Sequence, residues 1–224
     1  MNKRLAANLA AFITVFLWAS AFPLTKIIGE QITANPLSLI RCVVTAVFMI
    51  LLGLIAKSPS LHLRKPFEKK DLWLFLISGA TGLAFYYICY NMGLVTLTSA
   101  EASIISATAP VITSVMVYFI YKERINIIGW ISIVAAFAGV AIMMLWNGVF
   151  SIKVGAFWIL GMSVLFSIYC VLNRKLAEKG YNSVEIVAYS AIFATLLMSP
   201  VTPTTIRQLA ACDMPAILSA IYLA

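Results

Sequence analysis

Charged residues are scarce in this sequence of 224 residues: Lys, Arg, Asp and Glu make up only 11% of it, and hydrophobic residues make up 62%. A soluble domain is usually about 25% charged and about 45–50% apolar. A chain of this size cannot hide so much apolar surface from water in a single core. The scarcity of charge therefore excludes an ordinary soluble enzyme and predicts a membrane protein.

Residues that usually carry catalysis or bind metals are also rare. The chain has one histidine, His62, so it contains no HExxH motif and no zinc-ligand set. Its four cysteines lie far apart and show no CxxC spacing. Neither a GxSxG nucleophile elbow nor a phosphate-binding P-loop occurs. These absences argue against an intramembrane hydrolase and an ATP-driven pump, and we expect no enzymatic activity, no cofactor and no metal.

What the sequence does contain is a series of long apolar runs. About 20 apolar residues are needed to span the hydrocarbon core of a bilayer. The runs lie at residues 5–25, 42–56 (from 36 if Arg41 is tolerated), 72–100, 102–121, 125–152, 154–173, 186–206 and 214–224. They predict an all-α polytopic transmembrane helix bundle with seven full helices and the start of an eighth. The first run imitates a cleavable signal peptide but is longer than a signal core needs, so we expect it to remain as a helix.

The positions of the basic residues indicate the orientation of the helices. With a cytoplasmic N-terminus, only Lys26, Lys153 and Arg207 fall outside, and Arg41 falls within a helix. The 12 basic residues on the inside are Lys3, Arg4, Lys57, Arg64, Lys65, Lys69, Lys70, Lys122, Arg124, Arg174, Lys175 and Lys179. This excess follows the positive-inside rule and accounts for the net charge of +8 without a nucleic-acid partner. We expect a multi-pass protein of the cell membrane, in particular a bacterial inner membrane, in which the basic loop 57–70 anchors the topology rather than binding anionic headgroups.

A weak internal repeat relates the first helix to the sixth. Residues 16–26 and 165–175 each end an apolar helix in Lys and are followed by a short polar link and another apolar run. The offset of 149 residues covers five helices. Because five is odd, the second copy enters the membrane from the opposite side, as in the inverted repeats of many secondary transporters. We therefore predict a five-helix repeat at residues 1–148 and an incomplete second one at 149–224.

Several segments resemble the EamA-type permeases of the drug/metabolite transporter superfamily. They are Leu97-Thr-Ser-Ala-Glu-Ala-Ser, Ala107-Thr-Ala-Pro110, Tyr121-Lys-Glu123-Arg124, Gly129-Trp130 leading to Ala138-Gly139, Phe16-Leu-Trp18-Ala-Ser20, and Asn35-Pro36 followed by Arg41. The likeness covers essentially the whole chain. It implies ten helices in two five-helix halves with both ends in the cytoplasm. About 7.5 of those helices are present, so we expect a fragment or a truncated protein.

The resemblance also implies a function. It favours secondary transport, in the direction of export, of small organic solutes such as amino acids, other metabolites or drugs by alternating access. The expected partners are a small-molecule substrate and the lipid bilayer, while the oligomeric state is not predicted. A proton gradient and solute exchange both remain open as the energy source. A truncated or non-transporting membrane protein that acts as a helical partner subunit remains the alternative.

Polar and aromatic side chains on three helices are candidates for the substrate pathway. They are Thr14 and Trp18 on the first helix, Tyr86, Tyr90 and Asn91 on the third, and Ser167 and Tyr169 on the sixth. Tyr86 and Tyr90 are one turn apart and offer rings and hydroxyls to amphipathic or cationic solutes. The alternative is that these rings belong to the aromatic belt at the membrane surface.

A stripe of small polar residues follows one face of the fourth helix, at Ser99, Ser103, Ser106, Pro110 and Thr113. Pro110 removes one helical hydrogen bond and should kink the helix near the middle of the membrane. The hydroxyls could line a cavity there. They could equally line helix–helix contacts and bond to their own helix.

Two charged residues within the helices are candidates for charge recognition or proton coupling. Arg41 lies about 7.5 Å beyond Pro36, where it could bind an anionic substrate group or extend its guanidinium to the membrane surface. Glu101 sits in the first turn of the fourth helix. It could couple protons, or it could cap that helix, because a carboxylate is favourable at a helix N-terminus.

Overall fold

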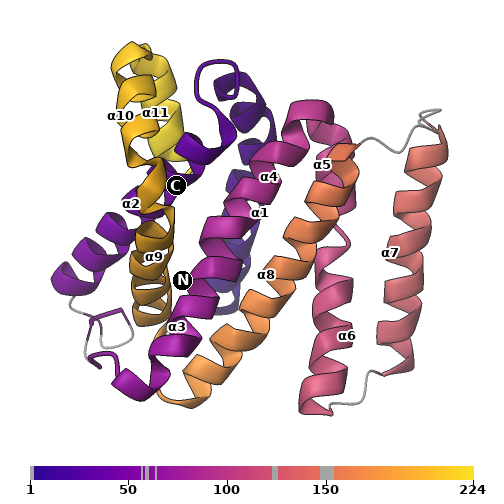
Figure 1. Cartoon of the computed structure of the whole chain (residues 1–224). Helices are drawn as coiled ribbons and strands as arrows, with labels where there is room; N and C mark the ends of the chain where they lie inside the picture. Colours follow the sequence, from indigo (N-terminus) through magenta and orange to yellow (C-terminus); the bar gives the residue numbers. More distant parts are fainter. Residues whose placement is uncertain (1–2, 57, 59–60, 64, 123–125, 147–153) are drawn as a thin grey trace.

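The structure is a computed structural model that describes residues 3–56, 58, 61–63, 65–122, 126–146 and 154–224 (Figure 1). Within these ranges all regular secondary structure is helical, which confirms the expected all-α bundle. Lys57, Arg64, Glu123, Arg124 and Lys153 lie outside the described residues. The predicted repeat boundary between residues 148 and 149 lies outside them as well.

A helix occupies each of the eight apolar runs. The first two are α1 (Lys3–Ile28) and α2 (Ala34–Ile55). The third run is continuous through η1 (Lys69–Asp71), α3 (Leu72–Gly79), the π-helical segment η2 (Ala80–Ala84) and α4 (Phe85–Thr96). The later runs form α5 (Ser99–Ser106), α6 (Ala109–Tyr121), α7 (Ile127–Trp146), α8 (Val154–Glu178), α9 (Ser183–Met198), η3 (Ser199–Val201), α10 (Thr202–Ala211) and α11 (Met214–Tyr222).

Five helical stretches in the described part of the chain are long and apolar enough to cross a membrane. They are Ala34–Ile55, Lys69–Thr96, Ser99–Tyr121, Val154–Glu178 and Ser183–Ala211. Large apolar side chains such as Phe12, Phe16, Ile55 and Phe119 are exposed on the outside of the bundle. An apolar outer surface is costly in water but suits contact with lipid.

Two helices begin at capping residues and not at the positions that the apolar runs predicted. The third run was expected to continue to residue 100, but α4 ends at Thr96, and Leu97 and Thr98 are extended. The Thr98 hydroxyl accepts a hydrogen bond from the Glu101 backbone N–H (3.2 Å), and the Glu101 carboxylate accepts one from the Thr98 N–H (2.7 Å). An equivalent capping box at Asn182 and Glu185 starts α9 at Ser183, three residues before the expected position.

The kink expected at Pro110 is a break between two helices. Helix α5 ends at Ser106, and α6 begins at Ala109 with Pro110 in its first turn. Proline is tolerated at this position because the first N–H groups of a helix have no partner within the helix.

The two expected halves of the chain are packed against each other throughout the bundle. Helix α2 packs against α9, and α4 packs against α8. At the α4–α8 contact the Gly155 N–H donates to Thr96 Oγ1 (3.0 Å), and a Cβ on Gly155 would lie only 2.6 Å from the Gly93 carbonyl. Helix α9 begins 149 residues after α2, which equals the offset of the sequence repeat. In Figure 1, α6 and α7 stand at one edge of the bundle.

A network of buried hydrogen bonds fastens the loop before α3 to the turn between α8 and α9. We call it the loop clamp; its members are Lys65, Asp71, Lys179, Tyr181, Asn182 and Glu185. The Glu185 carboxylate accepts backbone N–H groups from Lys65 (2.6 Å) and Asn182 (2.8 Å). Asp71 accepts the Tyr181 hydroxyl (3.1 Å) and pairs with Lys179 (2.7 Å). The two carboxylates that this network buries are therefore both held by groups of the protein itself, Glu185 by hydrogen bonds and Asp71 by a hydrogen bond and an ion pair.

Glu68 forms an exposed ion-pair group at the edge of the loop clamp. Its carboxylate pairs with Lys70 (2.6 Å) and Lys65 (3.3 Å). Hydrogen bonds from these two ammonium groups, that of Lys70 first, hold the pKa of Glu68 below its usual value. The ionised form of Glu68 is therefore favoured in the folded protein.

Candidate functional site

A cavity of about 840 Å³ lies between α1, α2, η2, α4, α8 and α11. We call it the central cavity. Helix α1 lines it with Thr14, Leu17, Trp18 and Ala21, and α2 contributes Arg41. Five aromatic residues from α1, α4 and α8 also line it, and we define the aromatic wall as Trp18, Tyr86, Tyr87, Phe166 and Tyr169. The other lining residues are Phe48, Gly82, Leu83, Tyr222, Leu223 and Ala224. The aromatic wall offers apolar surface together with hydroxyls and ring faces, which suits an amphipathic solute.

The π-helical segment η2 brings two elements of the cavity together. A Cβ on Gly82 would overlap the ring of Tyr169, so only glycine lets the α8 tyrosine lie against this segment. A π-helical turn holds an extra residue compared with an α-helical turn, and such turns often occur at functional sites. Following this turn, Tyr86 and the adjacent Tyr87 both line the cavity.

Arg41 is the charged side chain of the central cavity. It is only 7% exposed, and its guanidinium lies over the rings of Tyr87 (4.0 Å to the ring centre) and Tyr90 (5.3 Å). Cation–π contact with two rings is favourable for a buried guanidinium. Its Nε and Nη1 atoms are buried without a hydrogen-bond partner. Arg41 is thus a buried cation beside the cavity, and two of its nitrogen atoms have neither an acceptor in the protein nor contact with solvent.

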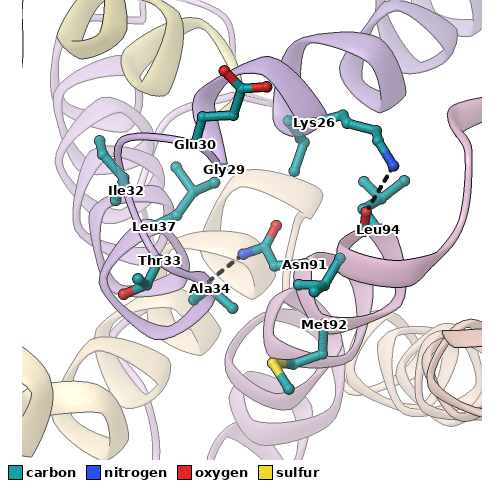
Figure 2. Close-up of a pocket in the computed structure, with 12 residues that line it drawn as sticks. Lys26, Gly29, Glu30, Ile32, Thr33, Ala34, Leu37, Asn91, Met92 and Leu94 are labelled. Carbon is teal, nitrogen blue, oxygen red and sulfur yellow. Dashed lines mark hydrogen bonds between the residues drawn. The ribbon is translucent and has the colours of Figure 1, made fainter. Parts of the chain in front are cut away.

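A second hollow of about 430 Å³, the Asn91 pocket, lies between the C-terminal half of α1, the start of α2 and α4 (Figure 2). The Asn91 amide donates to the Ala34 carbonyl and the Ser38 hydroxyl, both at 3.0 Å, whereas its Oδ1 has no partner. Lys26 donates to the Leu97 carbonyl at 2.6 Å and ties the end of α1 to the end of α4. A cation is favourable at this position because helix C-termini carry partial negative charge.

A pair of buried rings lies between the residues of α1 and α4 that line the two hollows. Helix α1 gives Ala21 to the central cavity and Thr25 to the Asn91 pocket. Between these positions, Phe22 contacts the ring of Tyr90, with ring centres 5.2 Å apart. Both side chains are buried. Along both helices the Phe22–Tyr90 pair is therefore placed between the residues that line the central cavity and those that line the Asn91 pocket.

The structure distributes the candidates from the sequence over several places. Thr14, Trp18, Arg41, Tyr86 and Tyr169 line the central cavity, Tyr90 lies beneath the Arg41 guanidinium, and Asn91 lines the second pocket. Glu101 caps α5. The remaining candidates are Ser103, Ser106, Pro110 and Ser167, which are not among the residues that line the central cavity.

The hydroxyls among these remaining candidates are engaged within and between helices. Ser103 donates to the Ala100 carbonyl (2.9 Å), and Ser106 donates to the Ser103 carbonyl (2.7 Å). Ser167 is fully buried, donates to its own helix at Ser163 (2.8 Å), and accepts the Thr113 hydroxyl (2.9 Å). A role for them in transport remains a prediction, and the hydrogen bonds that the structure shows are those of helix packing.

Two members of the aromatic wall were not among the candidates from the sequence. Tyr87 lies next to Tyr86, and a helical wheel places adjacent residues about 100° apart, so the face that holds Tyr86 and Tyr90 did not include it. Phe166 lies 149 residues after Leu17, and both line the cavity. The internal repeat, applied to Leu17 as well as to Trp18, would have pointed to Phe166.

Comparison with known proteins assigns the family. A model of the EamA-like transporter family matches residues 5–145. The chain belongs to the EamA-like transporter family. It is therefore a multi-pass membrane protein involved in transport, and not an enzyme.

Named relatives of this EamA-like protein are themselves described as transporters. The chain is 28% identical over 217 residues to a probable terminal-alkyne amino-acid exporter of Streptantibioticus cattleyicolor, covering 96% of the chain and 70% of that protein. It is 26% identical over 223 residues to the uncharacterized transporter YdfC of Bacillus subtilis, covering 99% and 71%. A crystal structure with 19% sequence identity superposes with a TM-score of 0.63 over 97% of the chain and 73% of its own, and supports the fold.

Proposed function

We propose that this EamA-like protein is a secondary transporter that exports small organic solutes, such as amino acids, other metabolites or drugs, through the central cavity. The observation that carries the proposal is the cavity itself, in which an aromatic wall and a buried arginine face one space of about 840 Å³. Relatives that include an amino-acid exporter by name support the same class of function. Its orientation is the one given by the basic residues, with the N-terminus in the cytoplasm of the cell.

Alternating access gives the Phe22–Tyr90 pair a defined role in this proposal. A solute in the central cavity cannot pass to the Asn91 pocket while these rings are in contact. A movement of α1 relative to α4 would part the rings and also break the contact of Lys26 with the Leu97 carbonyl. The Asn91 pocket is then the exit, and the central cavity is the binding site.

The test is uptake of a panel of labelled amino acids and organic cations into proteoliposomes, with and without a pH gradient. We expect Trp18→Ala and Tyr86→Ala to reduce transport strongly at normal levels of inserted protein. Trp130→Ala on α7 and Tyr118→Ala on α6 are matched controls, because both side chains lie on other helices away from the cavity. Equal losses in all four variants would contradict the pathway, and no transport by the wild type would favour a non-transporting helical partner subunit.

Proton coupling can be tested with the same vesicles. If the transport rate depends on the pH gradient and Glu101 carries the coupled proton, Glu101→Gln should abolish this dependence. Glu178→Gln is the control, because Glu178 is an exposed carboxylate at the end of α8 that does not line the central cavity. A pH dependence that survives Glu101→Gln assigns the coupling to another group or to solute exchange.

A further inference from the structure

A second network of hydrogen bonds fastens the turn between α1 and α2 to α10. We call it the α10 clamp; its members are Gln31, Thr33, Gln208 and Asp213. The side-chain oxygen of Gln208 accepts the backbone N–H of Thr33 (3.0 Å), and the Gln208 amide nitrogen donates to the Thr33 hydroxyl (3.0 Å). The Gln31 amide donates to the Asp213 carboxylate (3.3 Å). The α10 clamp therefore joins the beginning of α2 to the elements that follow α9.

The α10 clamp and the loop clamp occupy matching places in the expected repeat. Thr33 is the N-cap of α2, and Asn182 is the N-cap of α9 at an offset of 149 residues, which is that of the sequence repeat. Thr33 binds the segment after α9, and the Asn182 amide binds the segment after α2 by donating to the His62 carbonyl (2.9 Å). In Figure 1, α10 lies at the upper end of the bundle and the start of α3 at the lower end. Each clamp therefore joins one expected half to the other, at opposite ends of the bundle.

The two clamps differ in how firmly they hold. The carboxylates of the loop clamp, Asp71 and Glu185, are both 1% exposed, and beneath them the rings of Phe75 and Tyr181 pack with centres 5.0 Å apart. The bonds of the α10 clamp lie at the exposed surface, and those between Thr33 and Gln208 join uncharged groups. Hydrogen bonds to charged groups contribute more than neutral ones, which exchange readily for bonds to water. The α10 clamp is therefore the weaker of the two.

The α10 clamp borders the Asn91 pocket. Thr33 lines this pocket together with Ile32 and Leu37. Ile32 is fully buried and belongs with Leu37 to an apolar cluster against which Leu209 of α10 packs. A movement of α10 away from Thr33 would separate Leu209 from this cluster and widen the Asn91 pocket.

We propose that the α10 clamp is the gate of the Asn91 pocket and that the loop clamp is its counterpart at the other end of the bundle, so that one opens while the other holds. This inference rests on the proposed function and names the contacts that control access to its binding site. When two halves rock about a central site, contacts at one end break while those at the other end hold. Because the loop clamp is the stronger, the resting protein opens at the α10 clamp.

The test is the accessibility of a cysteine in the central cavity from each face of the membrane. Thr14→Cys is introduced after the four natural cysteines are replaced by alanine. Its reaction with a membrane-impermeant thiol reagent is timed in intact cells and in inverted membrane vesicles. With the N-terminus in the cytoplasm, as in the proposed function, the reagent meets the α10 clamp in cells and the loop clamp in vesicles. The measurement needs neither a known solute nor transport.

Two substitutions should act at opposite faces. Gln208→Ala removes the acceptor of the Thr33 N–H and should raise the rate in cells at least about fivefold, because a neutral hydrogen bond changes an equilibrium constant by about that factor. It should not raise the rate in vesicles. Glu185→Gln has one amide oxygen for two N–H groups and should raise the rate in vesicles at least about tenfold, because the lost bond is to a charged group. It should not raise the rate in cells.

Each substitution has a matched control on a neighbouring exposed side chain. Thr204→Ala is the control for Gln208→Ala, because Thr204 is exposed one turn earlier on α10 and is outside the clamp. Glu178→Gln is the control for Glu185→Gln, because Glu178 forms an exposed ion pair with Arg174. Both controls should leave both rates unchanged. The Gln208→Ala arm decides by itself if Glu185→Gln fails to fold.

A covalent link across the α10 clamp gives the reverse measurement. In the cysteine-free background, Thr33→Cys and Gln208→Cys are joined by a short, membrane-permeant bifunctional thiol reagent whose link dithiothreitol cleaves. We expect the link to slow transport in proteoliposomes at least about tenfold, because the gate is then held closed, and dithiothreitol to restore it. Arg174→Cys with Glu178→Cys is the control, since this link stays within α8 and should leave transport unchanged.

The outcomes distinguish this inference from the proposed function. A rate in cells that Gln208→Ala leaves unchanged would overturn the inference, as would two substitutions that raise the rate from the same face. Transport that continues across the linked α10 clamp would reject the inference alone. Opposite-face responses in a protein that transports none of the solutes would support the gate and reject the proposed function alone.

Discussion

The loop clamp and the central cavity each bury a charged side chain, Glu185 in one and Arg41 in the other. Glu185 is 1% exposed and accepts two backbone N–H groups at 2.6 and 2.8 Å. Arg41 is 7% exposed, and its Nε and Nη1 donate to no atom of the protein. A buried polar group that has its partners stabilises a fold, whereas one without them is costly to bury. The two regions therefore differ in how far the protein itself satisfies the charge that it buries.

The largest expected effect on stability is at the loop clamp. Glu185→Ala leaves the partly buried N–H groups of Lys65 and Asn182 without an acceptor and removes the carboxylate half of the capping box of α9. At about 1–3 kcal/mol for each buried unsatisfied group, we expect a loss of about 2–4 kcal/mol, measured as unfolding in detergent. Glu178→Ala is the control, because Glu178 forms an exposed ion pair with Arg174, and such pairs contribute close to zero. Equal losses in the two variants would remove the distinction between the regions.

The next largest effect is expected where the cavity depends on close packing. Gly82→Ala places a methyl group against the Tyr169 ring and pushes it into the central cavity, at a cost of about 1–3 kcal/mol and with a clear loss of transport. Adding Tyr169→Ala should recover part of the stability, because the clash is relieved. Gly161→Ala on α8 is the control, since its Cβ would meet nothing within 4 Å. We expect Gly161→Ala to stabilise the helix slightly. If Gly82→Ala also raised the stability, it would contradict the close contact of Gly82 with the Tyr169 ring.

A smaller effect of opposite sign is expected at Arg41. Arg41→Met removes a buried charge without hydrogen-bond partners and keeps an apolar side chain that can lie on the Tyr87 ring. Replacement of buried charges by apolar groups is often neutral or stabilising. We therefore expect an unfolding midpoint equal to or above that of the wild type. An unfolding midpoint of Arg41→Met well below that of the wild type would show that Arg41 stabilises the fold, as Glu185 does.

The smallest effect is expected at the exposed edge of the loop clamp. The pKa of Glu68 is held below its usual value near 4.5 by Lys70 and Lys65, so its ion pairs stabilise the protein fully above that value. This contribution disappears as the pH falls through the lowered pKa, because the carboxyl group is then protonated in both states. The difference in unfolding midpoint between wild type and Glu68→Gln should be slight at pH 7 and vanish in stronger acid. A difference that grows on acidification would contradict this sign.

The sequence predicted the helices better than the site. Long apolar runs located all eight helical segments, and the Thr98–Glu101 and Asn182–Glu185 pairs have the spacing of capping boxes. The η2 turn carries no comparable signal, because a π-helical turn depends on tertiary packing such as that of Gly82 on Tyr169. That Tyr87 lines the same cavity as Tyr86 is likewise a property of the tertiary structure. The hydroxyl stripe of α5 was ambiguous because serine bonds to its own helix as readily as it faces a cavity.

Solute protection of a cysteine in the cavity tests the central claim most directly. Thr14→Cys is introduced after the four natural cysteines, Cys42, Cys89, Cys170 and Cys212, are replaced by alanine. Its reaction with a water-soluble thiol reagent is timed with and without a solute that the protein transports, and Ser163→Cys, buried between helices, is the unreactive control. We predict that a solute at about ten times its Kd slows the reaction about tenfold. A transported solute that leaves the reaction rate unchanged would contradict a binding site in the central cavity.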